Sequence, residues 1–262
     1  MESTTTLAID IGATGIKAIL LNQLGQTTTS HQKRPRALTP KPPTPGAVMD
    51  VIVGLVKQLG TFDRVSVGFP GFVRNGVVVS APTLGKEWEG FHIADALQGL
   101  LSKPVRAAND ADVQGFGAIA GVGVELVLTL GTGVGTSLFI DGKLVPNLEI
   151  GNPKLSDRSL KKIGKKRWNK RLVKAISKLE ETFHYDRLHI GGGNSRQVDI
   201  SVLPPNVTII SNLNGLIGGI ALWHGSKTRQ PEPSNSSNSD DASSRQGTPE
   251  KKAKPDSEKR ET

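Results

Sequence analysis

Two kinds of apolar pattern alternate along the chain. Short apolar runs bounded by Gly, Asn or Pro are typical of strands, whereas apolar residues that recur every three or four positions are typical of helices. The short runs predict strands over residues 7–11, 16–21, 64–67, 77–79, 105–108, 126–130, 137–140, 188–190 and 207–210, with 26–34 as a further candidate. The longer period predicts helices over 49–59, 91–101, 112–121, 160–183 and 214–223, and the proline-rich segment 35–45 is expected to be a loop.

One strand–turn–strand unit occurs twice. Ile9-Asp10-Ile11-Gly12 aligns with Leu128-Thr129-Leu130-Gly131, and a Thr/Gly turn and a second strand follow in both places. The second unit is not a dinucleotide fingerprint, because the glycines after Leu130 lead into a strand rather than a helix. Two copies suggest two halves of similar topology that face each other. The alternative is that any glycine-containing β-hairpin has this appearance.

Composition separates a tail from the rest of the chain. Residues 226–262 contain almost no apolar side chain, so this segment cannot bury enough surface to offset its ordering entropy and is expected to be disordered. The chain has no cysteine, which excludes disulfides, thiolate zinc sites and a cysteine nucleophile. No apolar run is long enough to span a bilayer, and the first residues do not have the pattern of a signal peptide. A cytoplasmic protein without a membrane partner is therefore expected.

The positive charge belongs to one segment. The chain has a net charge of +9, and residues 154–178 alone hold 11 Lys or Arg and a single acid. The predicted helix 160–183 would place these cations opposite Leu160, Ile163, Trp168, Leu172 and Ile176. A surface of this kind concentrates a polyanion. A solvated helix face and a nucleic-acid site are the alternatives, and the second is disfavoured because Trp168 is the segment's one aromatic residue for stacking on bases.

Two motifs suggest phosphate chemistry. DIGATGIK, residues 10–17, is a Gly/Thr turn whose N–H groups can cradle phosphate oxygens, next to an acid able to hold Mg²⁺ through water and to Lys17. RAANDADVQGFG, residues 106–117, places Asp110 where a strand passes into a helix, as a candidate general base for a substrate hydroxyl. The alternatives that involve no ligand are a plain hairpin for the first motif and a helix N-cap for the second. Both roles can coexist in the second motif, with Asp112 as the cap and Asp110 facing a cleft.

Five motifs in order resemble a known family. LAIDIGATGIKA, VGFPGFVRNGVV, NDAD, TLGTGVGTSLFIDGKLVPNLE and IGGGNSR resemble the repressor–open reading frame–kinase (ROK) sugar kinases of the actin/hexokinase superfamily, and within them the polyphosphate glucokinases. The resemblance covers about residues 7–224. It implies an α/β, two-lobed actin-like ATPase (ribonuclease H-like) fold with a cleft between the lobes. The lobes would be residues 1–112, with the helix 212–225 packing back on them, and 113–211.

The resemblance also implies roles for individual residues. Asp110 would be the catalytic base, and Asn109, Glu149 and Asn152 would bind the sugar. The residues that would bind the phosphoryl donor are Asp10, Gly12, Thr14, Gly15, Lys17, Gly131, Thr132, Gly133, Gly191, Gly192 and Gly193. Asp10 would also hold Mg²⁺ through water. Further candidates for binding polyphosphate are Lys161, Lys162, Lys165, Lys166 and Arg167.

The expected activity is phosphoryl transfer from inorganic polyphosphate, with ATP as an alternative donor, to glucose or a related hexose. One departure concerns the sugar site, because Asn152 stands where the family's E-x-G-H motif has its His and Pro153 follows it. This departure keeps a second reading open, a non-catalytic sugar- or phosphate-binding member of the family. A nucleic-acid-binding module is a third. A homodimer stays open as the assembly.

Overall fold

The protein is represented by a computed structural model that describes residues 4–28, 35–146, 148, 150–211 and 213–224. All of these residues belong to one unit, Met1–Ser226. The expected disordered tail, residues 226–262, lies outside the described residues.

A five-stranded mixed sheet forms from the N-terminal residues. Its order is β3-β2-β1-β4-β7, in which β1 is antiparallel to β2, β2 to β3, and β1, β4 and β7 run parallel. The strands are β1 Thr6–Ile11, β2 Gly15–Leu21, β3 Arg36–Leu38, β4 Arg64–Phe69 and β7 Val105–Asn109. A small hairpin, β5 Phe72–Arg74 with β6 Val77–Ser80, and the 3-10 turn η1 Lys86–Trp88 complete this part.

A second sheet repeats the first. Its order is β10-β9-β8-β11-β12, with β8–β9 and β9–β10 antiparallel and β8, β11 and β12 parallel. The strands are β8 Val124–Leu130, β9 Val134–Ile140, β10 Lys143–Val145, β11 Arg187–Gly191 and β12 Val207–Ile209. Because strand order and directions match those of the first sheet, the repeat predicted from the two glycine hairpins is confirmed.

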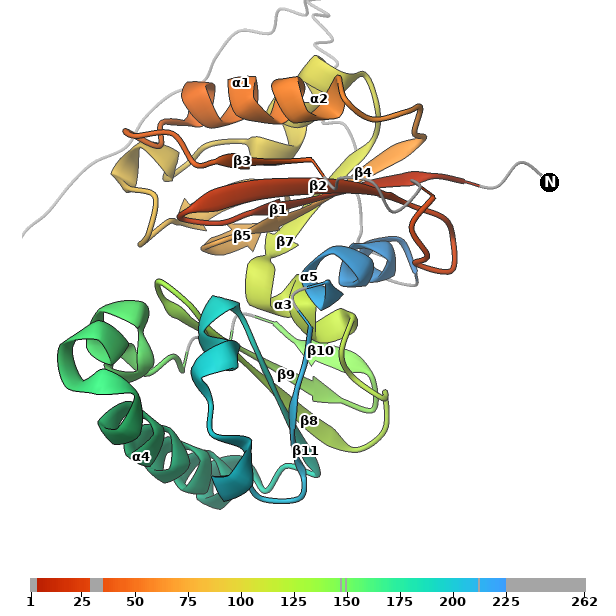
Figure 1. Cartoon of the computed structure of the whole chain (residues 1–262). Coiled ribbons are helices and arrows are strands. Elements are labelled where there is room, and N and C mark those ends of the chain that lie inside the picture. The colour runs from red at the N-terminus through yellow and green to blue at the C-terminus, as the bar shows by residue number, and fades with distance from the viewer. Residues whose placement is uncertain (1–3, 29–34, 147, 149, 212, 225–262) are drawn as a thin grey trace, which may run out of the picture. The chain divides into compact units, whose positions relative to one another are not determined.

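Each sheet has its own apolar core. In the first sheet, Leu7 and Ile9 are buried in a cluster with residues of helices α1 Pro45–Val56 and α2 Ile93–Leu101. In the second, Leu128 and Ile190 are buried in a cluster that includes Trp168 of the long helix α4 Asp157–Phe183. Figure 1 shows α1 and α2 on one side of the first sheet and α4 beside the second.

Helix α3 Asp110–Phe116 links the two sheets. Its Ala111 carbonyl accepts a hydrogen bond from Ser137 Oγ of β9 at 3.1 Å, and its Phe116 ring lies 5.0 Å from that of Phe139. Next to it lie α5 Asn214–Ile217 and the 3-10 helix η5 Gly218–Trp223 (Figure 1). Trp223 Nε1 of η5 donates to Ser66 Oγ on β4 at 2.8 Å. These contacts attach the last helical turns to the first sheet.

Five predicted elements differ from the structure. The helix expected over 49–59 spans Pro45–Val56. The loop 35–45 contains the short strand β3, because Arg36–Leu38 pairs with the start of β2. The helix expected over 112–121 begins at Asp110 and ends at Phe116. The helix expected over 214–223 is one α-helical turn followed by a 3-10 helix. The helix expected over 160–183 begins at Asp157 and is interrupted at Gly164, whose φ of 76° is accessible to glycine at little cost.

The candidate strand 26–34 lies partly outside the described residues, and Thr27 forms an isolated bridge with Leu21. Among the helices in the described part of the chain, none combines the length and apolar character that crossing a bilayer requires.

Candidate active site

Two carboxylates meet at one edge of the first sheet. Because β1, β4 and β7 are parallel, their carboxyl ends lie at the same edge, where open α/β sheets bind their ligands. Asp10 near the end of β1 is level with Gly68 of β4, and Gly68 is level with Ala108 of β7. Asp110 follows two residues later as the first residue of α3. A β-carbon at Gly68 would lie 3.6 Å from the Asp110 Cα.

The environment of Asp110 suits a proton acceptor. Burial raises the pKa of its carboxyl to about 7, with further increases from the negative charges of Asp10 and Asp112 and a partial opposing effect of backbone hydrogen bonds. A general base works best when its pKa lies close to the pH at which the enzyme operates. Asp110 can therefore take a proton at neutral pH.

Asn109 caps helix α3. Its Oδ1 accepts hydrogen bonds from the N–H groups of Ala111 at 2.8 Å and Asp112 at 3.3 Å. Its Nδ2 donates to the Gly71 carbonyl at 3.0 Å. The prediction that Asp112 is the cap is therefore wrong, because the cap is the residue just before the first helical turn. These bonds leave one Nδ2 hydrogen of Asn109 for the sugar contact predicted for it.

The first glycine turn joins β1 to β2. Lys17 Nζ lies 2.8 Å from Asp10 Oδ2. Gly12 N–H donates within the turn, to the Gly15 carbonyl at 3.0 Å, and Thr39 Oγ1 donates to the Gly12 carbonyl. Among the described residues no acceptor lies against the N–H groups of Ala13 and Thr14, so these two, rather than that of Gly12, are the donors free for a phosphate.

The second glycine turn joins β8 to β9 in the same way. Gly131 N–H donates to the Gly133 carbonyl at 3.0 Å, and within the described chain the N–H groups of Thr132 and Gly133 have no acceptor. The Gly131 carbonyl accepts from Asp157 N at 2.8 Å and from Asn194 Nδ2 at 3.3 Å. The turn is thereby tied to the start of α4 and to the 3-10 helix η3 Gly193–Gln197.

The triple glycine places β11 against this second turn. Gly191 ends β11, Gly192 has a φ of 84°, and Gly193 begins η3. A β-carbon at Gly192 would fall within 2.6 Å of the Leu130 backbone nitrogen, so only glycine fits there. Packing against Leu130 thus accounts for Gly192 without any ligand, while Gly193 is exposed.

The structure leaves the predicted sugar contacts incomplete. Glu149 lies outside the described residues. Asn152 is exposed, and its Oδ1 accepts from Lys154 N at 3.0 Å at the start of the 3-10 helix η2 Pro153–Leu155. The role of both residues toward a sugar stays a prediction.

The basic face of α4 is exposed, as its spacing predicted. Trp168, Leu172 and Ile176 are buried, whereas the Lys and Arg side chains before and after the interruption at Gly164 are exposed. The exposed cations include Lys161, Lys162, Lys165, Lys166 and Arg167. Lys161 lies 2.6 Å from Asp157, the one acid within the segment. The face therefore carries a strong positive field toward solvent.

Mg²⁺ fits the carboxylates present. Asp10 supplies hard oxygen ligands of the kind that Mg²⁺ prefers, and the charge of Asp10 is felt at Asp110. In the described part of the chain, no group of three or more His, Cys, Asp or Glu side chains is arranged to hold a metal. An ion at Asp10 would therefore keep most of its water ligands, as Mg²⁺ commonly does when it binds together with a phosphate substrate.

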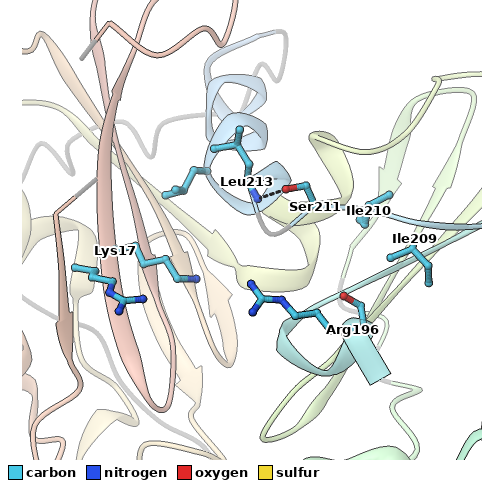
Figure 2. Close-up of a pocket in the computed structure, with 9 residues that line it drawn as sticks. Lys17, Arg196, Ile209, Ile210, Ser211 and Leu213 are labelled. Carbon is cyan, nitrogen blue, oxygen red and sulfur yellow. Dashed lines mark hydrogen bonds between the residues drawn. The ribbon is translucent and has the colours of Figure 1, made fainter. Parts of the chain in front are cut away.

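A pocket next to Lys17 was not predicted. It has a volume of about 560 Å³ and is lined by Lys17 and Arg36 of the first sheet and by Ser195, Arg196, Ile209, Ile210, Ser211, Leu213 and Leu216. Figure 2 shows the side chains of Lys17 and Arg196 directed toward each other across it. The sequence signal was weak, because it consists of a single Arg beside a proline-rich segment and another Arg three residues after the triple glycine.

Comparisons with known proteins agree with this geometry. Residues 6–147 match the model of the ROK family. Polyphosphate glucokinase from Mycobacterium tuberculosis (strain ATCC 25177 / H37Ra) is 30% identical over 235 residues, which cover 80% of this chain and 88% of that protein. Polyphosphate glucokinase from Mycobacterium leprae (strain TN) is 31% identical, covering 80% and 72%.

A solved structure extends the similarity to the fold. The inorganic polyphosphate/ATP-glucomannokinase from Arthrobacter sp. strain KM superposes with a TM-score of 0.75 at 31% identity, covering 84% of this chain and 100% of that one. The predicted α/β, two-lobed actin-like fold is confirmed. The chain therefore belongs to the ROK family.

Proposed function

We propose that this protein is a sugar kinase that transfers a phosphoryl group from inorganic polyphosphate, and also from ATP, to the 6-hydroxyl of glucose or a closely related hexose. The observation that carries the proposal is Asp110, a partly buried carboxyl with a pKa of about 7, beside the Asp10–Lys17 pair. The names of the relatives above, which specify polyphosphate and glucose or mannose chemistry, support the same substrate classes.

In the proposed reaction, the Asp110 carboxylate accepts the proton of the sugar hydroxyl as its oxygen attacks the terminal phosphorus. A new oxygen–phosphorus bond forms, and the bond to the next phosphate of the donor breaks, which leaves the donor one phosphate shorter. The Lys17 ammonium and the free N–H groups of Ala13, Thr14, Thr132 and Gly133 would stabilise charge on the transferred group. When bound, Mg²⁺ would neutralise phosphate charge, with Asp10 holding it through water.

The sugar is the less defined substrate. We propose that Asn109, Glu149 and Asn152 hydrogen-bond its hydroxyls. The position of Asn109 next to Asp110, and the bond that fixes its amide against Gly71, support this role. A hydroxyl bound at Asn109 would lie near the base, so that binding and proton transfer would depend on the same turn.

A coupled assay tests the proposal directly. Formation of glucose 6-phosphate is measured with glucose and either polyphosphate or ATP, side by side. Product formation with polyphosphate is the expected result. Calorimetric binding of glucose without product from either donor would instead support a non-catalytic sugar-binding protein. Tight RNA or DNA binding that survives loss of Asp110 would support a nucleic-acid-binding module.

Neutralising the basic face of α4 is expected to weaken the use of polyphosphate selectively. Changing Lys161, Lys162, Lys165 and Lys166 to Gln should raise KM for long-chain polyphosphate roughly tenfold or more, since focused surface charge changes association rates by about 10–10³-fold. KM for ATP should change much less. The effect should shrink as salt is added, because screening already weakens the field in the unmodified protein.

A charge-matched control separates this field from net charge. Lys41, Lys57, Lys86 and Lys143 are exposed and lie on other elements. The quadruple Gln variant at these positions should leave KM for polyphosphate close to that of the unmodified protein. Equal effects of the two quadruple variants, or equal effects on both donors, would contradict a polyphosphate role for α4.

A further inference from the structure

The pocket of Figure 2 is cationic on both sides. Lys17 and Arg36 come from the first sheet, and Arg196 comes from η3 at the edge of the second. The lining residues include no acid. Within the described chain, neither Arg36 nor Arg196 lies within ion-pair distance of a carboxylate. The pocket therefore presents guanidinium groups whose charge is not neutralised by the protein.

Strand register places the first two cations in a row with the reaction site. Asp10 of β1 is opposite Lys17 of β2, and Lys17 is opposite Arg36 of β3. Residues directly opposite each other on neighbouring strands project from the same face of a sheet. These side chains therefore form a row across one face of the first sheet, in the order Arg36, Lys17 and Asp10. Asp110 lies beyond Asp10. A ligand that begins at Asp110 and passes Lys17 reaches Arg36 next.

Hydrogen bonds fix Arg196 relative to the second glycine turn. Its neighbour Asn194 donates from Nδ2 to the Gly131 carbonyl, and Ser195 N donates to the Gly192 carbonyl at 3.1 Å. The next residue, Gln197, accepts at its carbonyl from Asn169 Nδ2 of α4 at 2.9 Å. Arg196 therefore lies on η3, which hydrogen bonds hold between the second glycine turn and helix α4.

The remaining walls are largely apolar. Ile209, Ile210, Leu213 and Leu216 line the pocket together with Ser195 and Ser211. Arg36 and Arg196 are themselves exposed, so their guanidinium groups are accessible to a charged ligand from solvent. A guanidinium group offers a fork of N–H donors that matches two oxygens of one phosphate. The volume lies within the range of about 300–1,000 Å³ that is usual for small-molecule sites, which leaves room for several linked phosphates.

We infer that Arg36 and Arg196 form a clamp, one arginine from each side of the pocket, for the phosphates of a long donor chain that lie beyond the first three. The clamp makes these two residues determinants of specificity for a long inorganic phosphate chain over a nucleoside triphosphate, whose uncharged ribose and base replace the later phosphates. The inference rests on the proposed kinase function and adds a site for the donor's distal part.

Single and double variants test the clamp. Arg36→Gln and Arg196→Gln are each expected to raise KM for long-chain polyphosphate roughly tenfold, because a hydrogen bond between charged groups is lost, with little change in kcat. KM for ATP should change less than about threefold by the same reasoning. In the unmodified protein KM should fall from tripolyphosphate to long chains, and the double variant should show a weaker dependence, because the basic face of α4 is unchanged. Arg74→Gln, an exposed arginine on β5, is the matched control and should behave like the unmodified protein.

Direct binding distinguishes failure of the clamp from failure of the kinase assignment. Calorimetry with tripolyphosphate and long-chain polyphosphate, without sugar, should show weaker long-chain binding in both variants. If the unmodified protein makes no sugar phosphate, the proposed function is wrong, while this binding comparison still tests the clamp. Unchanged long-chain binding in the double variant, or equal losses for ATP and polyphosphate, would overturn it.

Discussion

Changing Asp110 to Asn is expected to reduce kcat by about 10²–10⁴-fold, the usual contribution of a positioned general base. The amide has nearly the same size and cannot accept the hydroxyl proton. Asn109 still caps α3 in the variant, because its bonds to Ala111 and Asp112 do not involve the Asp110 side chain. The loss should therefore appear in kcat with polyphosphate and with ATP alike, measured by the coupled assay with saturating glucose.

The unmodified enzyme should show the matching pH dependence. Because the base works in its deprotonated form, kcat/KM is expected to rise as the pH increases through the Asp110 pKa of about 7. Removing the charge of Asp10 with Asp10→Asn should move this rise to lower pH, since that charge helps to raise the Asp110 pKa. The residual activity of Asp110→Asn should lack the rise.

The same titration affects folding stability. Asp110 binds its proton more tightly in the folded chain, with a pKa of about 7, than in the unfolded chain, where an Asp pKa is about 3.9. Its contribution to stability is present at low pH and falls as the pH rises from about 4 to about 7. At pH 8 the free energy of unfolding of Asp110→Asn should therefore exceed that of the unmodified protein by roughly 1–3 kcal/mol, which raises the denaturant concentration at the midpoint. At pH 4 the gain in stability should be smaller.

Asp112→Asn is the control for the base. It removes a carboxylate from the same helical turn, so it should lower the pH of the activity rise slightly and keep most of kcat. Near-normal turnover in Asp110→Asn would show that another group accepts the proton. A loss in Asp112→Asn as large as that in Asp110→Asn would indicate a general charge effect of this turn instead.

The sequence could predict those parts of the site that depend on residues close together in the chain. The Asp10–Lys17 turn, the Gly131–Gly133 turn and the position of Asp110 after a strand each depend on a local pattern, and the second occurrence of the hairpin predicted the matching sheets. For the two hairpins, a glycine turn between apolar runs has few alternative conformations.

Other features depend on contacts between distant segments. The start of α3 was placed two residues late, because Asn109, Asp110 and Asp112 are all suitable caps by residue type and only the backbone path selects Asn109. The approach of Arg36 to Lys17 requires the register of a three-residue strand that follows a long connection. Arg196 reaches the same pocket from η3, next to the second sheet. It is separated from Arg36 by so much of the chain that no periodic pattern in the sequence connects the two residues.

Trp168→Ala is expected to destabilise the fold by about 3–5 kcal/mol, the usual effect of deleting a large aromatic side chain from a core. Trp168 is fully buried among Leu126, Leu188 and other residues beneath α4, and its Nε1 donates to the Leu155 carbonyl at 3.1 Å. The variant loses this packing and leaves a cavity, while the Leu155 carbonyl loses its donor. Urea unfolding, followed by circular dichroism, should show the lower midpoint.

The same change links the core to the proposed use of polyphosphate, because Trp168 is the buried anchor of the helix that carries the exposed Lys165 and Lys166. At temperatures where the variant remains folded, KM for long-chain polyphosphate should increase more than KM for ATP. Trp168→Phe keeps most of the apolar contact and loses the hydrogen bond, so its cost should be smaller, about 1–2 kcal/mol. The exposed neighbour provides the control, since Lys170→Ala should change stability by less than about 0.5 kcal/mol. A Trp168→Ala variant as stable as Lys170→Ala would show that α4 is not held by this side chain, and the basic face would then need another support.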